Sequence, residues 1–150
     1  MTTQPTTDDL ALAAEFDGCL ATAVRLVDRV IASTFDEGLR DLGLRSTQVT
    51  LLVYLAALGW PTQSELAEAT MTDQTTLSRN LERLADRGLV RREADADDQR
   101  VVRYALSAGG RTVLGDALPH WRRAQRTIAA RLGEDLSAAL RSAAGALNTT

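Results

Sequence analysis

The sequence predicts a mainly α-helical fold with one small β-hairpin. Apolar residues recur at every third or fourth position along most of the 150-residue chain, which is the period of an amphipathic helix. Two short runs with strand-like alternation stand between the helical segments, and glycine or proline falls at several segment ends. Hydrophobic residues make up 45% of the chain, enough for a packed core. The length fits one domain, or one domain with an extended arm.

The N-terminal part divides into a tail and a long helix. Residues 1–9 are Thr-rich and polar, and we expect a disordered tail there. Residues 10–45 are predicted to form one helical segment, with an apolar stripe that runs along roughly eight turns. Its apolar stripe consists of Leu12, Phe16, Leu20, Val24, Val27, Ile31, Phe35, Leu39 and Leu42. Because a small globule rarely needs so long a helix, we expect an N-terminal dimerisation helix that packs against a second copy of the chain.

A buried helix follows this segment. Ser46 is expected to cap a helix over residues 47–58, which is apolar nearly all round. Gly59, Trp60 and Pro61 then end it.

Two shorter helices come next. Thr62 and Glu65 have the spacing of a capping box, which predicts a helix over residues 63–69. Thr72 is expected to cap the following helix over residues 73–87, whose inner face is Leu77, Leu81 and Leu84.

The remaining segments are a hairpin and two helices. Residues 89–93 and 100–107 are predicted strands joined by a polar tip. A helix-turn-helix followed directly by a hairpin is the winged-helix arrangement, so residues 46–107 are predicted to form a winged helix-turn-helix domain. Residues 108–150 are predicted C-terminal helices that complete a dimerisation platform.

Several kinds of function are excluded by residue counts. Cys19 is the only cysteine and His120 the only histidine, so we expect no disulfide, zinc site or catalytic dyad. There is no Gly-rich phosphate loop, and we predict no catalytic residue, no cofactor and no enzyme activity. The most apolar stretch, residues 49–60, is too short to cross a bilayer, and residues 1–9 do not resemble a signal peptide. We therefore expect a cytoplasmic protein without a membrane partner.

The distribution of charge allows a nucleic-acid partner. The net charge is −3, but residues 74–103 contain seven arginines and six acids. The predicted helix over residues 73–87 carries Gln74, Thr75 and Ser78 near its start. The N-terminal end of a recognition helix is the part that contacts base edges. Arg79 would reach a base or a phosphate, Ser64 a phosphate, and Arg100 the minor groove. The alternative is an ordinary solvated helix face, because Glu82 and Asp86 would repel phosphate.

The same region resembles the MarR family of transcriptional regulators. Residues 63–111 resemble that family's helix-turn-helix and wing, and Asp98-Gln99-Arg100 matches its Asp-x-Arg wing motif. The resemblance implies that Arg100 enters the minor groove and that Arg83 pairs with Asp98. Thr70 differs from the glycine often found in the turn. The predicted DNA-binding residues are Ser64, Thr72, Gln74, Thr75, Thr76, Ser78, Arg79, Arg83, Asp98 and Arg100.

The resemblance also implies a mechanism. Family members are usually homodimers that bind a pseudo-palindromic site in double-stranded DNA, act as repressors and respond to small phenolic or lipophilic effectors. Arg25, His120 and Trp121 are candidate effector contacts, although dimer salt bridges or ordinary packing also explain them. Cys19 is either a redox-sensing thiol or a small buried residue on an apolar helix face. A winged-helix module that binds another protein instead of DNA is a further alternative.

Overall fold

The computed structural model describes residues 4–147, except for the side chain of Leu147, and confirms the predicted fold class. The described chain is mainly helical with a two-stranded antiparallel hairpin. It divides into a first unit that ends at Ser33 and a second unit that begins at Thr34. Within residues 4–147, no helix has both the length and the apolar character needed to span a membrane.

The predicted long N-terminal helix is wrong, because two helices replace it. Helix α1 spans Thr7–Ala14 and α2 spans Leu20–Leu39. Gly18 lies between them with a φ of +76°, which an α-helix does not allow. The apolar period continues through this break, so periodicity alone could not reveal it.

The predicted tail is also too long. The Thr6 hydroxyl accepts a hydrogen bond from the Asp9 backbone N–H at 3.2 Å, and the Asp9 carboxylate accepts one from the Thr6 N–H at 2.8 Å. This capping box starts α1 at Thr7. The beginning of the predicted tail, residues 1–3, lies outside the described residues.

The second unit begins inside α2. Phe35 and Leu39 are buried, whereas the apolar side chains of the first unit are largely exposed. A single turn of 3-10 helix, η1, follows over Arg40–Leu42. The unit boundary falls within the helix because only its C-terminal end joins the main core.

Helix α3 spans Ser46–Leu58, so Ser46 is its first residue and not its cap. The Ser46 N–H donates to the Asp36 carboxylate at 2.6 Å, and the Arg45 N–H donates to the Gln48 side chain at 3.0 Å. These side chains satisfy N–H groups at the start of the helix, which makes a serine cap unnecessary.

The helix-turn-helix consists of α4 (Gln63–Thr70) and α5 (Gln74–Asp86). The capping box of Thr62 with Glu65 is confirmed. Thr72 does not cap α5, because the Asp73 carboxylate accepts the Thr76 N–H at 2.9 Å. The left-handed position in the turn is Met71, with a φ of +50°, so Thr70 remains helical where the family often has glycine.

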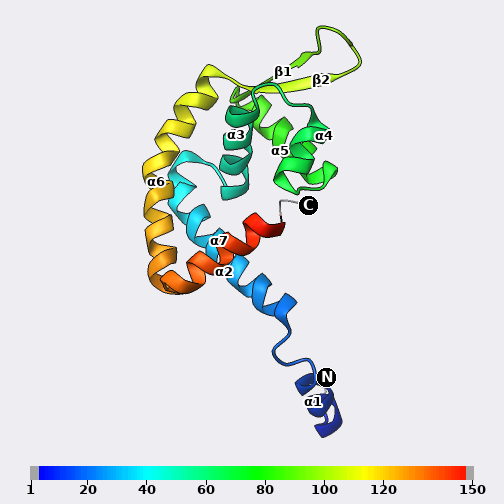
Figure 1. Cartoon of the computed structure of the whole chain (residues 1–150), viewed down its shortest axis with the longest axis vertical. Coiled ribbons are helices and arrows are strands. Elements are labelled where there is room, and N and C mark those ends of the chain that lie inside the picture. The colour runs from blue at the N-terminus through cyan, green and yellow to red at the C-terminus, as the bar shows by residue number, and fades with distance from the viewer. Residues whose placement is uncertain (1–3, 148–150) are drawn as a thin grey trace. The chain divides into compact units, whose positions relative to one another are not determined.

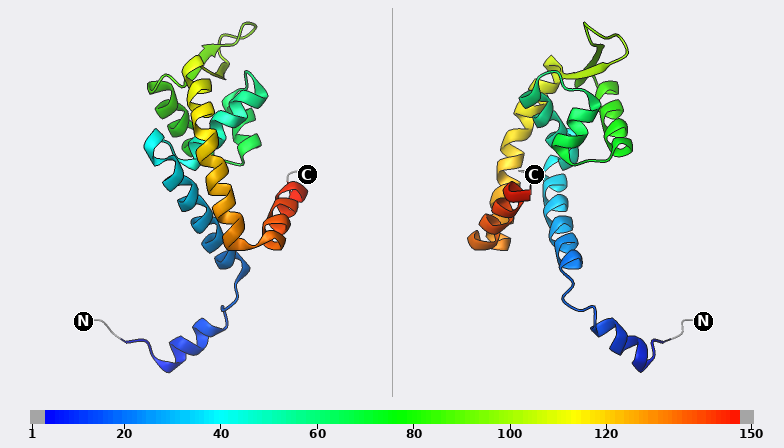
Figure 2. Two further views of the ribbon diagram at one scale, coloured as in Figure 1. Left: turned by 90° about the vertical axis from the view of Figure 1, so that its left-hand side faces the viewer. Right: turned by 45° about the vertical axis from the view of Figure 1, so that its right-hand side comes forward.

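The hairpin consists of β1 (Val90–Ala94) and β2 (Val102–Leu106) in antiparallel register. Figure 1 shows it projecting from the end of the group formed by α3, α4 and α5. Helix α6 (Ala108–Leu132) starts from a confirmed Ser107 cap. Helix α7 (Glu134–Leu147) turns back from the end of α6 and diverges from it (Figure 2).

The core of the second unit fixes the hairpin to the helices. Leu52, Leu66, Leu77 and Leu84 are almost fully buried and belong to one hydrophobic cluster. At the base of the hairpin, a Cβ on Gly110 would lie 2.1 Å from the Leu89 carbonyl oxygen. Only glycine permits this close approach between α6 and Leu89, the residue before β1, so backbone packing helps to set the position of the wing.

Candidate nucleic-acid interface

Helix α5 presents a polar surface opposite its buried leucines. Leu77, Leu81 and Leu84 are at most 2% exposed, which anchors one face of the helix. On the outward surface, a shallow depression is lined by Gln74, Thr75, Ser78, Arg79 and Glu82. Four of the predicted DNA-binding residues therefore lie together, with one acid among them.

The other predicted residues of this region lie apart from that depression. Thr76 and Arg83 are exposed but belong to a different flank of α5, as the helical period requires. Thr72 is half-buried in the turn, where its hydroxyl donates to the Thr70 carbonyl oxygen at 3.2 Å. Ser64 is exposed in the first turn of α4.

A contact that sequence reasoning missed holds Gln74 in place. The Gln63 side-chain amide donates to the Gln74 side-chain oxygen at 3.0 Å and to the Gln74 backbone carbonyl at 3.3 Å. The Tyr104 hydroxyl lies 3.5 Å from the Gln63 side-chain oxygen and donates to it. This chain of hydrogen bonds orients the first side chain of α5. Helical or strand periodicity could not predict this chain of contacts, because its residues lie on three separate elements.

The starts of both helices carry ionised carboxylates. Hydrogen bonds from the Thr62 backbone N–H and hydroxyl lower the pKa of Glu65. Hydrogen bonds from the Thr76 side chain and N–H lower the pKa of Asp73. These acids satisfy N–H groups that would otherwise face an anion, so any contact of α4 and α5 with an anion would come mostly from their outward side chains.

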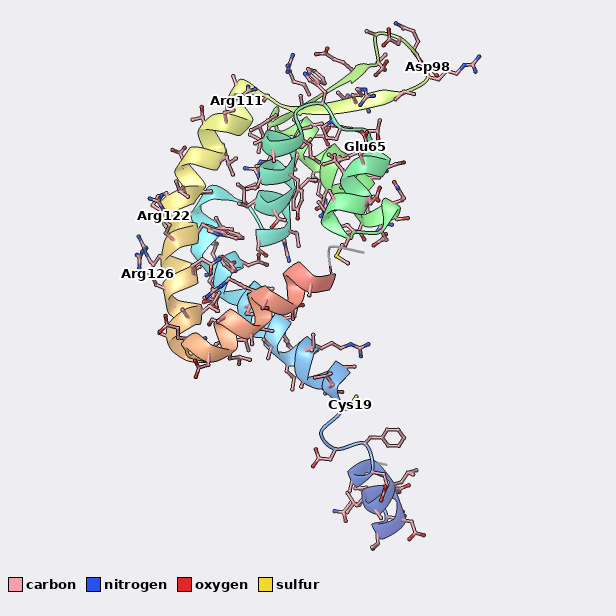
Figure 3. All side chains as sticks on the ribbon, in the orientation of Figure 1. Cys19, Glu65, Asp98, Arg111, Arg122 and Arg126 are labelled. Carbon is pink, nitrogen blue, oxygen red and sulfur yellow. The ribbon has the colours of Figure 1, made fainter. Side chains whose placement is uncertain are left out.

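The wing loop follows β1 and carries Asp98 and Arg100. Asp98 lies at the far end of the hairpin (Figure 3), and its carboxylate accepts the Arg100 N–H at 3.0 Å. Arg100 is exposed. The expected ion pair of Arg83 with Asp98 is not formed among the described residues, because the Asp98 carboxylate is used inside the loop.

A different ion pair supports the wing. The Arg103 Nε donates to the Asp95 carboxylate, and its Nη1 lies 3.5 Å from a Glu65 carboxylate oxygen. The Arg103 hydrogen bond lowers the pKa of Asp95, to which the N–H groups of Asp97 and Asp98 also donate. The same Asp95 contact raises the pKa of Arg103. Neither Asp95 nor Arg103 was predicted as a site residue.

A largely apolar cavity of about 640 Å³ lies between α3, the hairpin and α6. Of the two neighbouring residues predicted as effector contacts, Trp121 lines this cavity and His120 does not. The other lining residues were not predicted as effector contacts, among them Trp60, Arg91 and Arg111. The Arg91 guanidinium lies 5.1 Å from the centre of the Trp60 ring. Arg25 belongs to the first unit and is exposed.

Cys19 lies immediately before α2 and is exposed, which contradicts the alternative of a small buried residue on an apolar helix face. At this position the side chain faces the unpaired backbone N–H groups at the start of α2, and not an apolar helix face. Hydrogen bonds from the Thr22 backbone N–H and side chain, and then from the Ala21 N–H, lower the pKa of the thiol.

Comparison with known proteins agrees with this architecture. A family model described as the MarR family matches residues 42–101. The transcriptional regulator MosR of Mycobacterium tuberculosis, solved in complex with DNA, is 35% identical with a TM-score of 0.75. That match covers 87% of this chain and 93% of MosR.

Two curated relatives match over shorter segments. The transcriptional regulator HosA of Escherichia coli is 46% identical over 57 residues, which is 38% of this chain and 42% of HosA. The transcriptional repressor NicR of Pseudomonas putida is 35% identical over 85 residues, which is 57% of this chain and 54% of NicR. These matches therefore span about half of each relative or less.

The fold and the arrangement of α4, α5 and the hairpin define a winged helix-turn-helix protein. The chain belongs to the MarR family of transcriptional regulators. This membership supports the prediction that it is a regulator and not an enzyme.

Proposed function

We propose that the chain binds a pseudo-palindromic site in double-stranded DNA as a homodimer and represses transcription. The observation that carries the proposal is the depression on α5, where Gln74, Thr75, Ser78 and Arg79 gather on the outward face of a firmly anchored helix. A major groove admits such a helix. Arg100 on the wing would enter the adjacent minor groove. The likeness to MosR, whose structure contains DNA, supports this assignment.

The dimer is supported by apolar surface that a single chain leaves uncovered. In the first unit, Leu10, Phe16 and Leu20 are 58% to 76% exposed. In the second unit, Leu118 of α6 and Leu136 of α7 are also exposed. Burying these side chains against a second copy would remove them from water. The name of NicR supports repression as the direction of control.

The cavity beside α6 is the proposed effector site. Trp60 and Trp121 offer aromatic surfaces, and Arg91 and Arg111 offer positive charge at the same cavity. A small aromatic or lipophilic ligand fits these walls. By binding one arrangement of the wing and α5 better than another, it would shift the population away from the DNA-binding state. Arg25 and His120 remain weaker candidates, because neither lines this cavity.

DNA binding is tested by selecting fragments from genomic DNA and titrating them by fluorescence anisotropy at several salt concentrations. We expect affinity to fall steeply with salt, by roughly one log-log unit per phosphate contact. Arg100→Ala is expected to weaken specific binding by about 1–3 kcal/mol. Arg141→Ala, an exposed position on α7, is the matched control and should change nothing. No preference for any DNA over heparin would instead favour the protein-interaction module.

A redox-sensing regulator is the second candidate, favoured by the exposure of Cys19 at the start of α2. Its thiolate sulfur would attack peroxide, break the O–O bond and become a sulfenic acid, with hydroxide as the leaving group. Peroxide should then release DNA from the unmodified chain but not from Cys19→Ser. Equal release from both would exclude this role for the thiol.

A further inference from the structure

Arg103 occupies an unusual position in the wing, because it points its charge back toward the helices. It lies on β2 and is only partly exposed, with 35% of its side chain accessible. A backbone bridge joins it to Thr62, and the neighbouring Tyr104 N–H donates to the Pro61 carbonyl oxygen at 2.9 Å. The hairpin is therefore attached at Arg103 and Tyr104 to the segment between α3 and α4.

The Arg103 guanidinium contacts three different parts of the fold. Its Nε binds the Asp95 carboxylate in the wing loop. Its Nη1 donates to the Trp60 backbone carbonyl at 2.9 Å and lies 3.5 Å from the Glu65 carboxylate at the start of α4. A planar guanidinium with several fixed donors can hold three acceptors at once, which a lysine ammonium on a flexible stem does less precisely.

Asp95 passes this restraint to the rest of the loop. One carboxylate oxygen binds Arg103, and the other accepts the N–H groups of Asp97 at 2.9 Å and Asp98 at 3.2 Å. Asp98 in turn accepts the Arg100 N–H at 3.0 Å. The orientation of the loop that carries Arg100 thus depends on where Arg103 holds Asp95.

Trp60 connects the same guanidinium to the effector cavity. Its indole ring lines the cavity and lies against Arg91, while its carbonyl oxygen accepts from Arg103. A displacement of Trp60 would therefore move the acceptor that fixes Arg103.

We propose that Arg103 is a positioning residue that holds the wing in its DNA-binding arrangement and couples it to Trp60 at the cavity wall. This inference rests on the proposed function, since it concerns how the wing reaches DNA. Arg103 acts through Asp95 and does not itself contact phosphate.

The first test uses Asp95→Asn, which keeps an oxygen for the loop N–H groups but removes the charge that Arg103 binds. Simple electrostatics predicts stronger DNA binding after the loss of an acid. The proposal predicts weaker binding, by about 2- to 30-fold, the usual range for a coupling contact. Asp97→Asn, in the same loop, is the matched control and should not weaken binding.

A double-mutant cycle combines Asp95→Asn with Arg103→Leu, and Arg103→Lys is measured beside it. We expect both single Arg103 variants to weaken binding, the double variant to bind no worse than Arg103→Leu, and the salt dependence to keep its slope. Additive losses, or a slope reduced by about one unit per protomer, would show that Arg103 touches phosphate and would overturn the proposal. An unmodified chain that binds no DNA would instead refute the proposed function itself.

The coupling to the cavity is tested by ¹⁹F NMR of chain labelled with 5-fluorotryptophan. The chain has two tryptophans, and Trp121→Phe assigns their signals. Saturating DNA should shift the Trp60 signal in the unmodified chain, and this shift should be lost in Arg103→Leu at equal saturation. An equal shift in both chains, or none in the unmodified chain, would overturn the coupling.

Discussion

Replacing Gln63 by leucine tests how the structure prepares α5 to distinguish bases. Gln63 donates to the Gln74 side-chain oxygen at 3.0 Å, which leaves the Gln74 amide N–H groups to face DNA. Leucine removes this donor but retains a good helix former at the first position of α4. The fold should therefore survive, since Asp73 and not Gln63 caps α5.

The size of the effect follows from the contacts that are lost. A hydrogen bond between neutral amides contributes about 0.5–1.5 kcal/mol net. An unrestrained glutamine also retains up to about 2 kcal/mol of side-chain entropy that it would lose on binding a base. Because both side chains are at the surface, we expect a loss near 1 kcal/mol, or about five-fold in Kd.

The assay is fluorescence anisotropy with the selected DNA site and with each single base-pair substitution of it. In Gln63→Leu, discrimination should fall at the base pair next to Gln74 and remain intact elsewhere. Ser64→Ala gives the contrast, because loss of a phosphate contact weakens all sequences alike. Unchanged discrimination in Gln63→Leu, or losses that add to those of Gln74→Ala, would refute the proposed orientation.

Three further predictions concern stability and assembly. Gly110→Ala should destabilise the fold by about 1–3 kcal/mol, because its Cβ meets the Leu89 carbonyl. Gly145→Ala, with open space at its Cβ, is the control, and equal urea midpoints would contradict the packing argument. Because the pKa of Asp73 is lowered in the folded state, its ionised carboxylate stabilises the fold at pH values above the ordinary pKa of 3.8. This contribution is lost as the pH falls through the lowered pKa. The difference in Tm between the unmodified chain and Asp73→Ala should therefore shrink in acid, and a constant difference would contradict it. Val24→Asp should weaken the proposed dimer in sedimentation experiments, whereas an unchanged dimer would place the interface elsewhere.

Local hydrogen bonding explains which helix ends were predictable from the sequence. Thr62 and Glu65 form their capping box within four residues, so spacing alone revealed it. Thr6 and Asp9 have an equivalent spacing, but the surrounding Thr-rich sequence suggested a tail. The start of α3 depends on Asp36, ten residues away, and no local pattern contains that contact.

The same distinction applies to the candidate site. The outward face of α5 was predictable because a helix places Thr75 and Arg79 one turn apart on one side. Gln63 and Gln74 lie eleven positions apart in the chain, and Arg103 and Trp60 lie 43 apart. These contacts arise only when the hairpin folds onto the helix-turn-helix. Residue type could not identify Arg103 as a support, because the chain uses arginine for all 17 of its basic residues.

The contacts divide the seven arginines of residues 74–103 into two groups. Arg103 binds Asp95, Arg91 binds Glu93, and Arg87 donates to the backbone carbonyls of η1 and Gly43. Arg79, Arg83, Arg92 and Arg100 make no ion pair among the described residues and are exposed.

These four arginines are the cations of the region left for DNA, beside four acids that make no ion pair among the described residues either: Glu82, Asp86, Asp97 and Asp98. Four arginines in each of two protomers would contact at most about eight phosphates, which limits the log-log salt slope to about −7. A steeper slope would require arginines outside this region, such as Arg122 and Arg126 on the outer side of α6 (Figure 3). Because phosphate contacts carry no base information, sequence preference would depend on the geometry of α5 and the wing and not on the size of this slope.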